Sequence, residues 1–173
     1  PQKRLDFLID VAVESKKQNV PLRFSFFGEG PKFFQTKRRI SELGVDDIVD
    51  TPGVVDNVYA PMAEHDLYVS ASNREGFPNA LLEAMAAGRP AVVSDIDPHK
   101  EVLEGTDAGI CVEDSVDAWI STFKRLLENR GELIPMADKA RKTAMTHHIS
   151  ITAQKTKDLY DSLLEIRDDK KFK

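Results

Sequence analysis

Cysteine is almost absent from this sequence: Cys111 is the single one in 173 residues, so the chain has no internal disulfide. No run of about 18 apolar residues is present for a membrane span, and we expect no secretory leader because the chain does not open on a charged-then-apolar pattern. Positive charge is also scarce, since 24 Lys and Arg stand against 29 Asp and Glu. The net charge of -5 argues against broad binding to duplex nucleic acid, which needs clustered cations, and leaves a small ligand held locally.

Short apolar segments alternate with helical segments along the first two thirds of the chain. Apolar runs bounded by Gly, Pro or Asp predict strands at residues 22–27, 47–51, 67–71, 91–95 and 109–112. Helical spacing of apolar residues predicts helices at residues 5–13 and 33–43, and three more after the last strand, at 115–129, 132–146 and 149–168. Strands separated by helices require crossover connections. We therefore predict one α/β domain with a doubly wound parallel sheet, covered by helices on both faces.

Ligands of open parallel sheets bind at the carboxyl ends of the strands, so the loops that follow the strands are the candidate positions. The segment GEGP (Gly28–Pro31) follows the first strand and is either a bare turn or a backbone site for phosphate. The segment TPGVVDN (Thr51–Asn57) exposes backbone around Gly53 after the second strand. The segment SDIDPHKE (Ser94–Glu101) follows the fourth strand, and we predict a polar loop there without ligand spacing.

The loop after the third strand, within ASNREGFPNALLEAMAAGRPAVVSD (residues 71–95), has the most informative pattern. Pro78 suits the first position of a helix that runs to Ala87, and Gly88 ends that helix. Free amides of Asn79, Ala80 and Leu81 are expected at its amino end, where the macrodipole adds about half a positive charge. The amino end of this helix is therefore a predicted anion site.

Two glutamates flank the predicted anion site. Glu83, inside the helix, offers two carboxylate oxygens to a vicinal diol, and Glu75, before the first turn, faces whatever is attached beyond the anion. Taken alone, Glu83 is better explained as a solvated helix residue and Glu75 as a charged loop residue. Together they outline a phosphate flanked by two hydroxyl-bearing groups.

The segment EGFPNALLE, followed by AMAAGRPAVVSD, resembles the donor-site signature of the retaining GT-B glycosyltransferases of family four, in which seven residues separate two glutamates. The segments QKRLDFLIDVA, FFGEGP, VDTPGVVDNVYAPMAEHDLYVSAS and KDLYDSLL resemble other parts of the family in the expected order. The resemblance implies that residues 1–173 form the nucleotide-sugar-binding, Rossmann-like half of a GT-B fold with carboxyl-terminal helices. It also implies transfer of a sugar from a nucleoside diphosphate sugar to an acceptor hydroxyl, most similar to bacterial enzymes that build surface polysaccharides.

The resemblance implies roles for individual residues. Glu75 is expected to contact hydroxyls of the donor sugar together with the amides of Gly76 and Phe77, and Lys3 to neutralise the diphosphate. We regard Glu75 and Lys3 as the candidate catalytic residues. The other donor-binding positions that the resemblance implies are the amides of Asn79 and Ala80 for the diphosphate, Glu83 for the ribose, the backbone of Gly53 and Val54 for the base, and the loop at Gly28.

Two features of the family are missing from this sequence. A strand that ends in Gly-Arg normally precedes the segment that begins here and lies in the middle of the sheet, and its arginine joins the lysine at the phosphates. The amino-terminal domain that binds the acceptor is also not present. We therefore expect this chain alone to be inactive in transfer.

The resemblance further implies a UDP- or GDP-sugar as donor, no metal or other cofactor, and an acceptor glycan or glycolipid bound through the missing domain. We expect no nucleic acid partner and a cytoplasmic location, with peripheral contact to the inner face of the membrane left open. Two alternatives also stay open: a sugar-nucleotide binding module without turnover, and a nucleotide-sugar epimerase of the same architecture.

Overall fold

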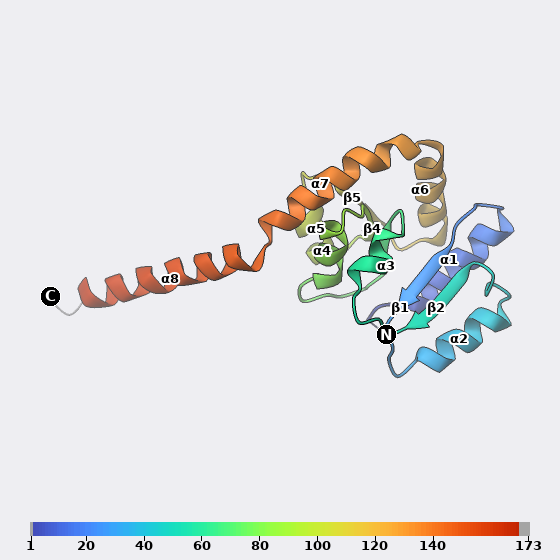
Figure 1. Ribbon diagram of the computed structural model, residues 1–173, viewed down its shortest axis with the longest axis horizontal. Helices are drawn as coiled ribbons and strands as arrows, with labels where there is room; N and C mark the ends of the chain where they lie inside the picture. The colour runs from blue at the N-terminus through green and yellow to red at the C-terminus, as the bar shows by residue number, and fades with distance from the viewer. Residues whose placement is uncertain (1, 170–173) are drawn as a thin grey trace.

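The computed structural model describes residues 2–169, without the side chains of Thr152 and residues 165–169. Within this range strands alternate with helices up to residue 112, and helices follow (Figure 1). The elements in chain order are α1 (Leu5–Lys17), β1 (Phe24–Phe27), α2 (Phe33–Glu42), β2 (Val49–Gly53), α3 (Tyr59–Ala63), β3 (Tyr68–Ser70), α4 (Asn79–Ala86), β4 (Ala91–Ser94), α5 (Asp97–Leu103), β5 (Gly109–Val112), α6 (Val116–Glu128), the 3-10 helix η1 (Arg130–Glu132), α7 (Leu133–Thr146) and α8 (Ile149–Asp169).

The strands are parallel, as predicted, but hydrogen bonding divides them into two sheets. β1 pairs with β2, and β4 lies between β3 and β5. A cavity of about 1480 Å³ is lined by both β1 and β3, with Phe24 and Phe26 from the first strand and Tyr68 and Ser70 from the second. The prediction of one continuous sheet is therefore wrong for the described residues.

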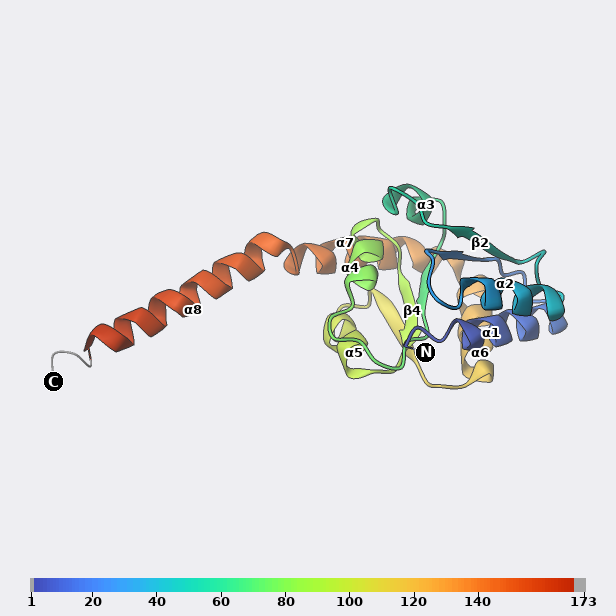
Figure 2. The same cartoon turned by 90° about the horizontal axis from the view of Figure 1, so that it is seen from below.

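Strand β4 shows why the fold is doubly wound. Its four residues are all buried, and successive side chains of a strand point to opposite faces. Val92 packs in a core cluster with Ile9 of α1 and Trp119 of α6, whereas Ala91 and Val93 belong to a second cluster with residues of α4, α5 and α7. Figure 2 shows α4 and α5 on one side of β4, and α1 and α6 on the other. The predicted fold class, a parallel α/β arrangement covered on both faces, is confirmed.

Helix α5 occupies residues 97–103, so the prediction of a loop across Ser94–Glu101 is wrong. Ile96 has extended backbone angles, and Pro98 lies in the first turn, where its missing N–H has no helical partner to lose. Asp97 places a negative charge at the positive end of the helix. Helix α3 has no counterpart among the predicted helices, and β2 lies at residues 49–53 rather than 47–51.

Helix α4 begins one residue later and ends one residue earlier than predicted, and Gly88 terminates it as predicted. Gly88 has a φ of +72°, its N–H donates to the Met85 carbonyl (2.9 Å), and the Arg89 N–H donates to the Ala84 carbonyl (2.9 Å). These two bonds form a Schellman motif, which needs a left-handed residue that glycine supplies without strain. Pro78 is the residue that caps the amino end.

Helix α8 extends away from the two sheets (Figures 1 and 2). Its extent agrees closely with the predicted helix at 149–168. The side chains of Leu159, Tyr160, Leu163 and Leu164 are exposed, and α8 supplies none of the described residues of either core cluster. The fold that positions the candidate site therefore lies within residues 2–146.

We predict that Gly109→Ala destabilises the protein by about 1 to 3 kcal/mol. Gly109 of β5 pairs with Ala91 of β4, and a Cβ atom at this position would lie 2.7 Å from the Ala91 carbonyl oxygen. Because that oxygen belongs to the backbone of a buried strand, relief of the clash requires a shift of the strand pair. Urea denaturation followed by circular dichroism measures the free energy of unfolding.

Gly131→Ala is the control for this prediction. Nothing lies within 4 Å of a Cβ atom built at Gly131, and its φ is not positive. We expect its free energy of unfolding to change by less than about 0.5 kcal/mol. Equal unfolding free energies for the two variants would contradict the clash at β4 and β5.

Candidate functional site

The loop of residues 71–78 joins β3 to α4 and carries Glu75 at the carboxyl end of the parallel strands. The segment that leads into α1 lies beside this loop, because the Asn73 N–H donates to the Gln2 carbonyl (3.1 Å). Lys3 follows Gln2 directly. The fold thus brings the two candidate catalytic residues to the same edge of the sheet.

Lys3 and Glu75 form an ion pair. The Lys3 Nζ atom lies 2.8 Å from the Glu75 Oε1 atom, and the Gln2 Nε2 atom donates to Glu75 Oε2 at 3.2 Å. The Glu75 side chain is only 8% exposed, whereas that of Lys3 is 59% exposed. A nearly buried carboxylate therefore has both of its oxygens occupied by side chains of the segment before α1.

The surroundings of Glu75 keep it ionised. Burial alone would raise the pKa of its carboxyl, but hydrogen bonds from Lys3 and Ser72, together with the charge of Lys3, outweigh burial and hold the pKa below its usual value. His99 contributes a smaller electrostatic effect in the same direction. Glu75 is consequently a carboxylate at neutral pH, able to accept hydrogen bonds and not to donate them.

The start of α4 differs in part from the predicted anion site. The Asn79 N–H donates to the Phe77 carbonyl (3.0 Å), so it is not free as predicted. The Ala80 N–H makes no hydrogen bond to another described residue. The Leu81 N–H was also predicted to be free, but it donates to the Pro78 carbonyl (3.0 Å). A bond of the Leu81 kind is usual in a first helical turn. Within the described residues, Ala80 is thus the predicted diphosphate contact whose amide is free.

The cavity between β1 and β3 extends to several of the predicted site residues. Lys3, Gly28, Ala80 and Glu83 all line it. Glu83 is half-buried on α4, so it is not the fully solvated helix residue of the simpler interpretation. Glu75 does not line the cavity itself but contacts Lys3, which does. The remaining predicted residues lie outside the lining: Gly53, Val54, Gly76, Phe77 and Asn79.

The loops after β1 and β2 contact each other. The Gly28 N–H donates to the Gly53 carbonyl (2.6 Å), and both residues have positive φ angles, +102° and +87°. The Gly28 amide is therefore engaged and does not serve as a free phosphate donor. The Val54 side chain next to this contact is exposed. The predicted base contact at Gly53 and Val54 thus lies where the loops after β1 and β2 are joined by a hydrogen bond, and the apolar Val54 side chain is exposed there.

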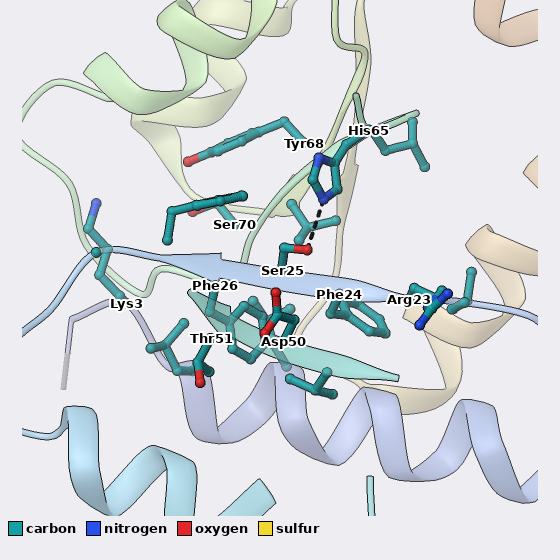
Figure 3. A pocket seen from close by; sticks show the side chains of 18 of the residues that line it. Lys3, Arg23, Phe24, Ser25, Phe26, Asp50, Thr51, His65, Tyr68 and Ser70 are labelled. Atoms are coloured by element: carbon teal, nitrogen blue, oxygen red, sulfur yellow. Dashed lines mark hydrogen bonds between the residues drawn. The ribbon is translucent and has the colours of Figure 1, made fainter. Parts of the chain in front are cut away.

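A second polar contact crosses the same cavity. Figure 3 shows His65 beside Ser25 of β1, with 2.9 Å between His65 Nε2 and Ser25 Oγ. His65 Nδ1 donates to the Pro61 carbonyl (2.6 Å), because a carbonyl only accepts. Tyr68 lies on β3 next to this contact, and burial raises the pKa of its hydroxyl to about 12. The His65–Ser25 contact therefore ties the segment before β3 to the neighbouring sheet.

Sequence reasoning missed a group of buried polar residues behind Glu75. Ser70, Ser72 and Ser94 lie at or just after the carboxyl ends of β3 and β4, and His99 lies on α5, all buried. The signal that could have found them is the run of polar residues at two neighbouring strand ends, where parallel strands converge on one edge.

Among residues 2–169, no cluster of three or more His, Cys, Asp or Glu side chains has the arrangement of a metal site. In the same range, no helix combines the length and the apolar character that crossing a bilayer requires.

The family described as glycosyl transferases group 1 has a model that matches residues 1–146 of this chain. An exopolysaccharide phosphotransferase of Streptomyces coelicolor is 27% identical over 172 residues, which cover 98% of this chain and 18% of that protein. The N-acetyl-alpha-D-glucosaminyl L-malate synthase of Bacillus anthracis is 30% identical over 157 residues, which cover 89% of this chain and 40% of that protein. The chain therefore spans less than half the length of these relatives.

A solved structure with the same fold is a variant of S. aureus TarM in complex with Fondaparinux, alpha-GlcNAc-glycerol and UDP. It is 26% identical to this chain with a TM-score of 0.81, and the match covers 92% of this chain and 33% of that one.

We predict that Lys3→Met raises the pKa of Glu75, because burial remains while the largest stabilising partner of the carboxylate is lost. In the native protein the lowered pKa stabilises the fold above the usual carboxyl pKa of about 4.3, and this contribution disappears as the pH falls through the folded-state value. The variant loses that contribution. Carbon-13 NMR of the Glu75 carboxyl over pH 2 to 8 measures the pKa, with Glu75→Gln to assign the signal.

Lys17→Met is the matched control for Lys3→Met. Lys17 pairs with Glu14 on the exposed face of α1, three residues away along the same helix. This variant is expected to leave the pKa of Glu75 unchanged. A Glu75 pKa that is the same in Lys3→Met and in Lys17→Met would show that the ion pair does not set the charge state of the carboxyl.

Proposed function

We propose that this chain, which belongs to the family of glycosyl transferases group 1, binds the nucleoside diphosphate sugar in an enzyme that transfers the sugar to an acceptor hydroxyl during the synthesis of a cell-surface glycan. The observation that carries the proposal is the contact between Lys3 and Glu75 at the loop that leads into α4. A cation, the amino end of a helix and two carboxylates at one edge of a parallel sheet match the chemistry of a diphosphate between two hydroxyl-bearing groups.

The proposed donor lies with its diphosphate between Lys3 and the start of α4. The free Ala80 amide and the helix macrodipole act on one side of the phosphates, and the Lys3 ammonium acts on the other. Glu83 accepts hydrogen bonds from the ribose hydroxyls, and Glu75 accepts them from the sugar. The base contacts the backbone near Gly53 and Val54.

In the proposed reaction, the negative charge that develops in the transition state accumulates mainly on the leaving diphosphate. The bond from the anomeric carbon to the phosphate oxygen breaks, and its electron pair leaves with the diphosphate. The acceptor oxygen forms the new bond on the same face of the sugar, and its proton passes to the leaving phosphate oxygen, so the configuration is retained. Lys3 and the amino end of α4 stabilise the developing anion, a contribution that is usually large in such sites. The proposal includes no metal, because these groups supply the positive charge.

The proposal extends to the whole protein in three respects. The acceptor is a glycan or a glycolipid, and a domain outside this chain binds it. The protein works in the cytoplasm, with peripheral contact to the inner face of the membrane.

A binding module without turnover differs from this enzyme in one measurable respect, because it binds the donor and gives no acceptor-dependent release of nucleotide.

We predict that Glu83→Ala weakens the binding of UDP or GDP by about 1 to 3 kcal/mol, the usual cost of losing hydrogen bonds to a charged group. This change corresponds to a rise in Kd of about 5- to 150-fold. Isothermal titration calorimetry with each nucleotide measures the Kd, and the nucleotide with the tighter binding identifies the base.

Glu128→Ala is the control for the loss of one negative charge. Glu128 lies exposed at the end of α6, outside the cavity lining. We expect native affinity for this variant. An unchanged Kd for Glu83→Ala, in a protein that binds the nucleotide, would remove Glu83 from the proposed ribose site.

A further inference from the structure

A buried polar network lies behind Glu75 and connects it to helix α5. His99 of α5 is 1% exposed, and its Nδ1 atom lies 2.9 Å from the Ser94 carbonyl oxygen and 3.4 Å from Ser94 Oγ. The Ser94 hydroxyl donates to the Ser72 carbonyl. Ser72 Oγ lies 3.2 Å from Ser70 Oγ. The network thus runs from α5 across the ends of β4 and β3 to the loop that carries Glu75.

The hydrogen-bond directions in this network follow from the chemistry of its groups. A carbonyl only accepts, so His99 Nδ1 carries the hydrogen that it donates to Ser94. The Ser94 hydroxyl has one hydrogen, which it gives to the Ser72 carbonyl. The Ser72 hydroxyl acts as a hydrogen-bond donor that lowers the pKa of the Glu75 carboxyl, and its oxygen lies 3.2 Å from Ser70 Oγ, where either hydroxyl can donate. Each donor therefore has an acceptor, which is the condition under which a buried network orders its members.

We propose that His99 is a positioning residue for Glu75: through Ser94 and Ser72 it holds the loop of residues 71–78 so that the Glu75 carboxylate points at the sugar of the bound donor. The proposal rests on the proposed function, because it assigns the sugar to Glu75. His99 itself does not touch the donor in this role. It acts by fixing the Ser72 backbone and hydroxyl, which in turn fix the carboxylate.

Electrostatics agree with this arrangement. Burial lowers the pKa of His99, against a raising effect of the Ser94 carbonyl and of Glu75, while the charge of Lys3 lowers it further. Glu75 and Lys3 are the charged side chains that act on the imidazole within the described residues. His99 is therefore a neutral donor at neutral pH, and the network needs no charge on it to orient Glu75.

Two substitutions of His99 distinguish a role in positioning Glu75 from a role in filling space in the core. His99→Asn keeps an N–H donor at the place of Nδ1, and His99→Leu keeps apolar volume without a donor. His148→Leu is the control for loss of an imidazole, because His148 lies exposed between α7 and α8. Ser72→Ala and Ser94→Ala remove single hydroxyls from the network and provide the test if His99→Leu does not fold.

The first measurement is the pKa of Glu75 by carbon-13 NMR in the protein without ligand. The second is the Kd of UDP and of UDP-N-acetylglucosamine by calorimetry. We expect His99→Leu, Ser72→Ala and Ser94→Ala to raise the pKa of Glu75. We also expect each of them to raise the Kd of UDP-N-acetylglucosamine about tenfold, while the Kd of UDP alone stays within about twofold of the native value. His99→Asn and His148→Leu are expected to resemble the native protein in both measurements.

Two results would overturn the role of His99. One is a Glu75 pKa that is the same in the native protein and in every network variant that folds. The other is equal damage from His99→Asn and His99→Leu, which would mean that the imidazole fills space. If the native protein binds neither UDP nor GDP, with or without an attached sugar, the proposed function fails, and the NMR comparison still decides whether His99 positions Glu75.

Discussion

The ion pair between Lys3 and Glu75 is the contact on which the candidate site depends, because it joins two segments 72 residues apart in the chain. Neither residue lies in a helix or a strand. Their positions are set by the start of α1 on one side and by the ends of β3 and α4 on the other. Any change in how α1 packs on the sheet therefore reaches the site through Lys3, and any change in the loop of residues 71–78 reaches it through Glu75.

The two faces of β4 explain how the fold holds these segments. Val92 packs toward α1 and α6, and Ala91 and Val93 pack toward α4, α5 and α7. One short strand thus anchors the helix that follows Lys3, the helix that begins beside Glu75 and the helix that carries His99. The interruption between β1 and β3 lies on the other side of β3, where the His65–Ser25 contact is a described link between the two sheets.

The strands were predictable from sequence because short apolar runs bounded by Gly, Pro or Asp need no knowledge of their neighbours. The parallel class and the end of α4 at Gly88 follow from similarly local rules. Helix α5 was missed because its seven residues are too few to show helical periodicity and because its buried face includes a histidine. The pairing of Lys3 with Glu75 was not predictable, since it depends on how two distant segments of the chain meet. The hydrogen bond of Asn79 to Phe77 depends on the turn that the backbone makes at Pro78. The roles assigned to the site residues remain predictions.

The pairing of Lys3 with Glu75 bears on selectivity for the proposed donor. The Lys3 side chain is exposed, so solvent screens its attraction to Glu75 and a phosphate can compete for the ammonium. Glu75 is nearly buried, however, and a buried acceptor that loses its partner costs about 1 to 3 kcal/mol. A ligand that attracts Lys3 without offering hydroxyls to Glu75 therefore leaves part of that cost unrecovered. A sugar attached to the diphosphate supplies those hydroxyls, so the pairing itself favours the complete donor over the nucleotide alone.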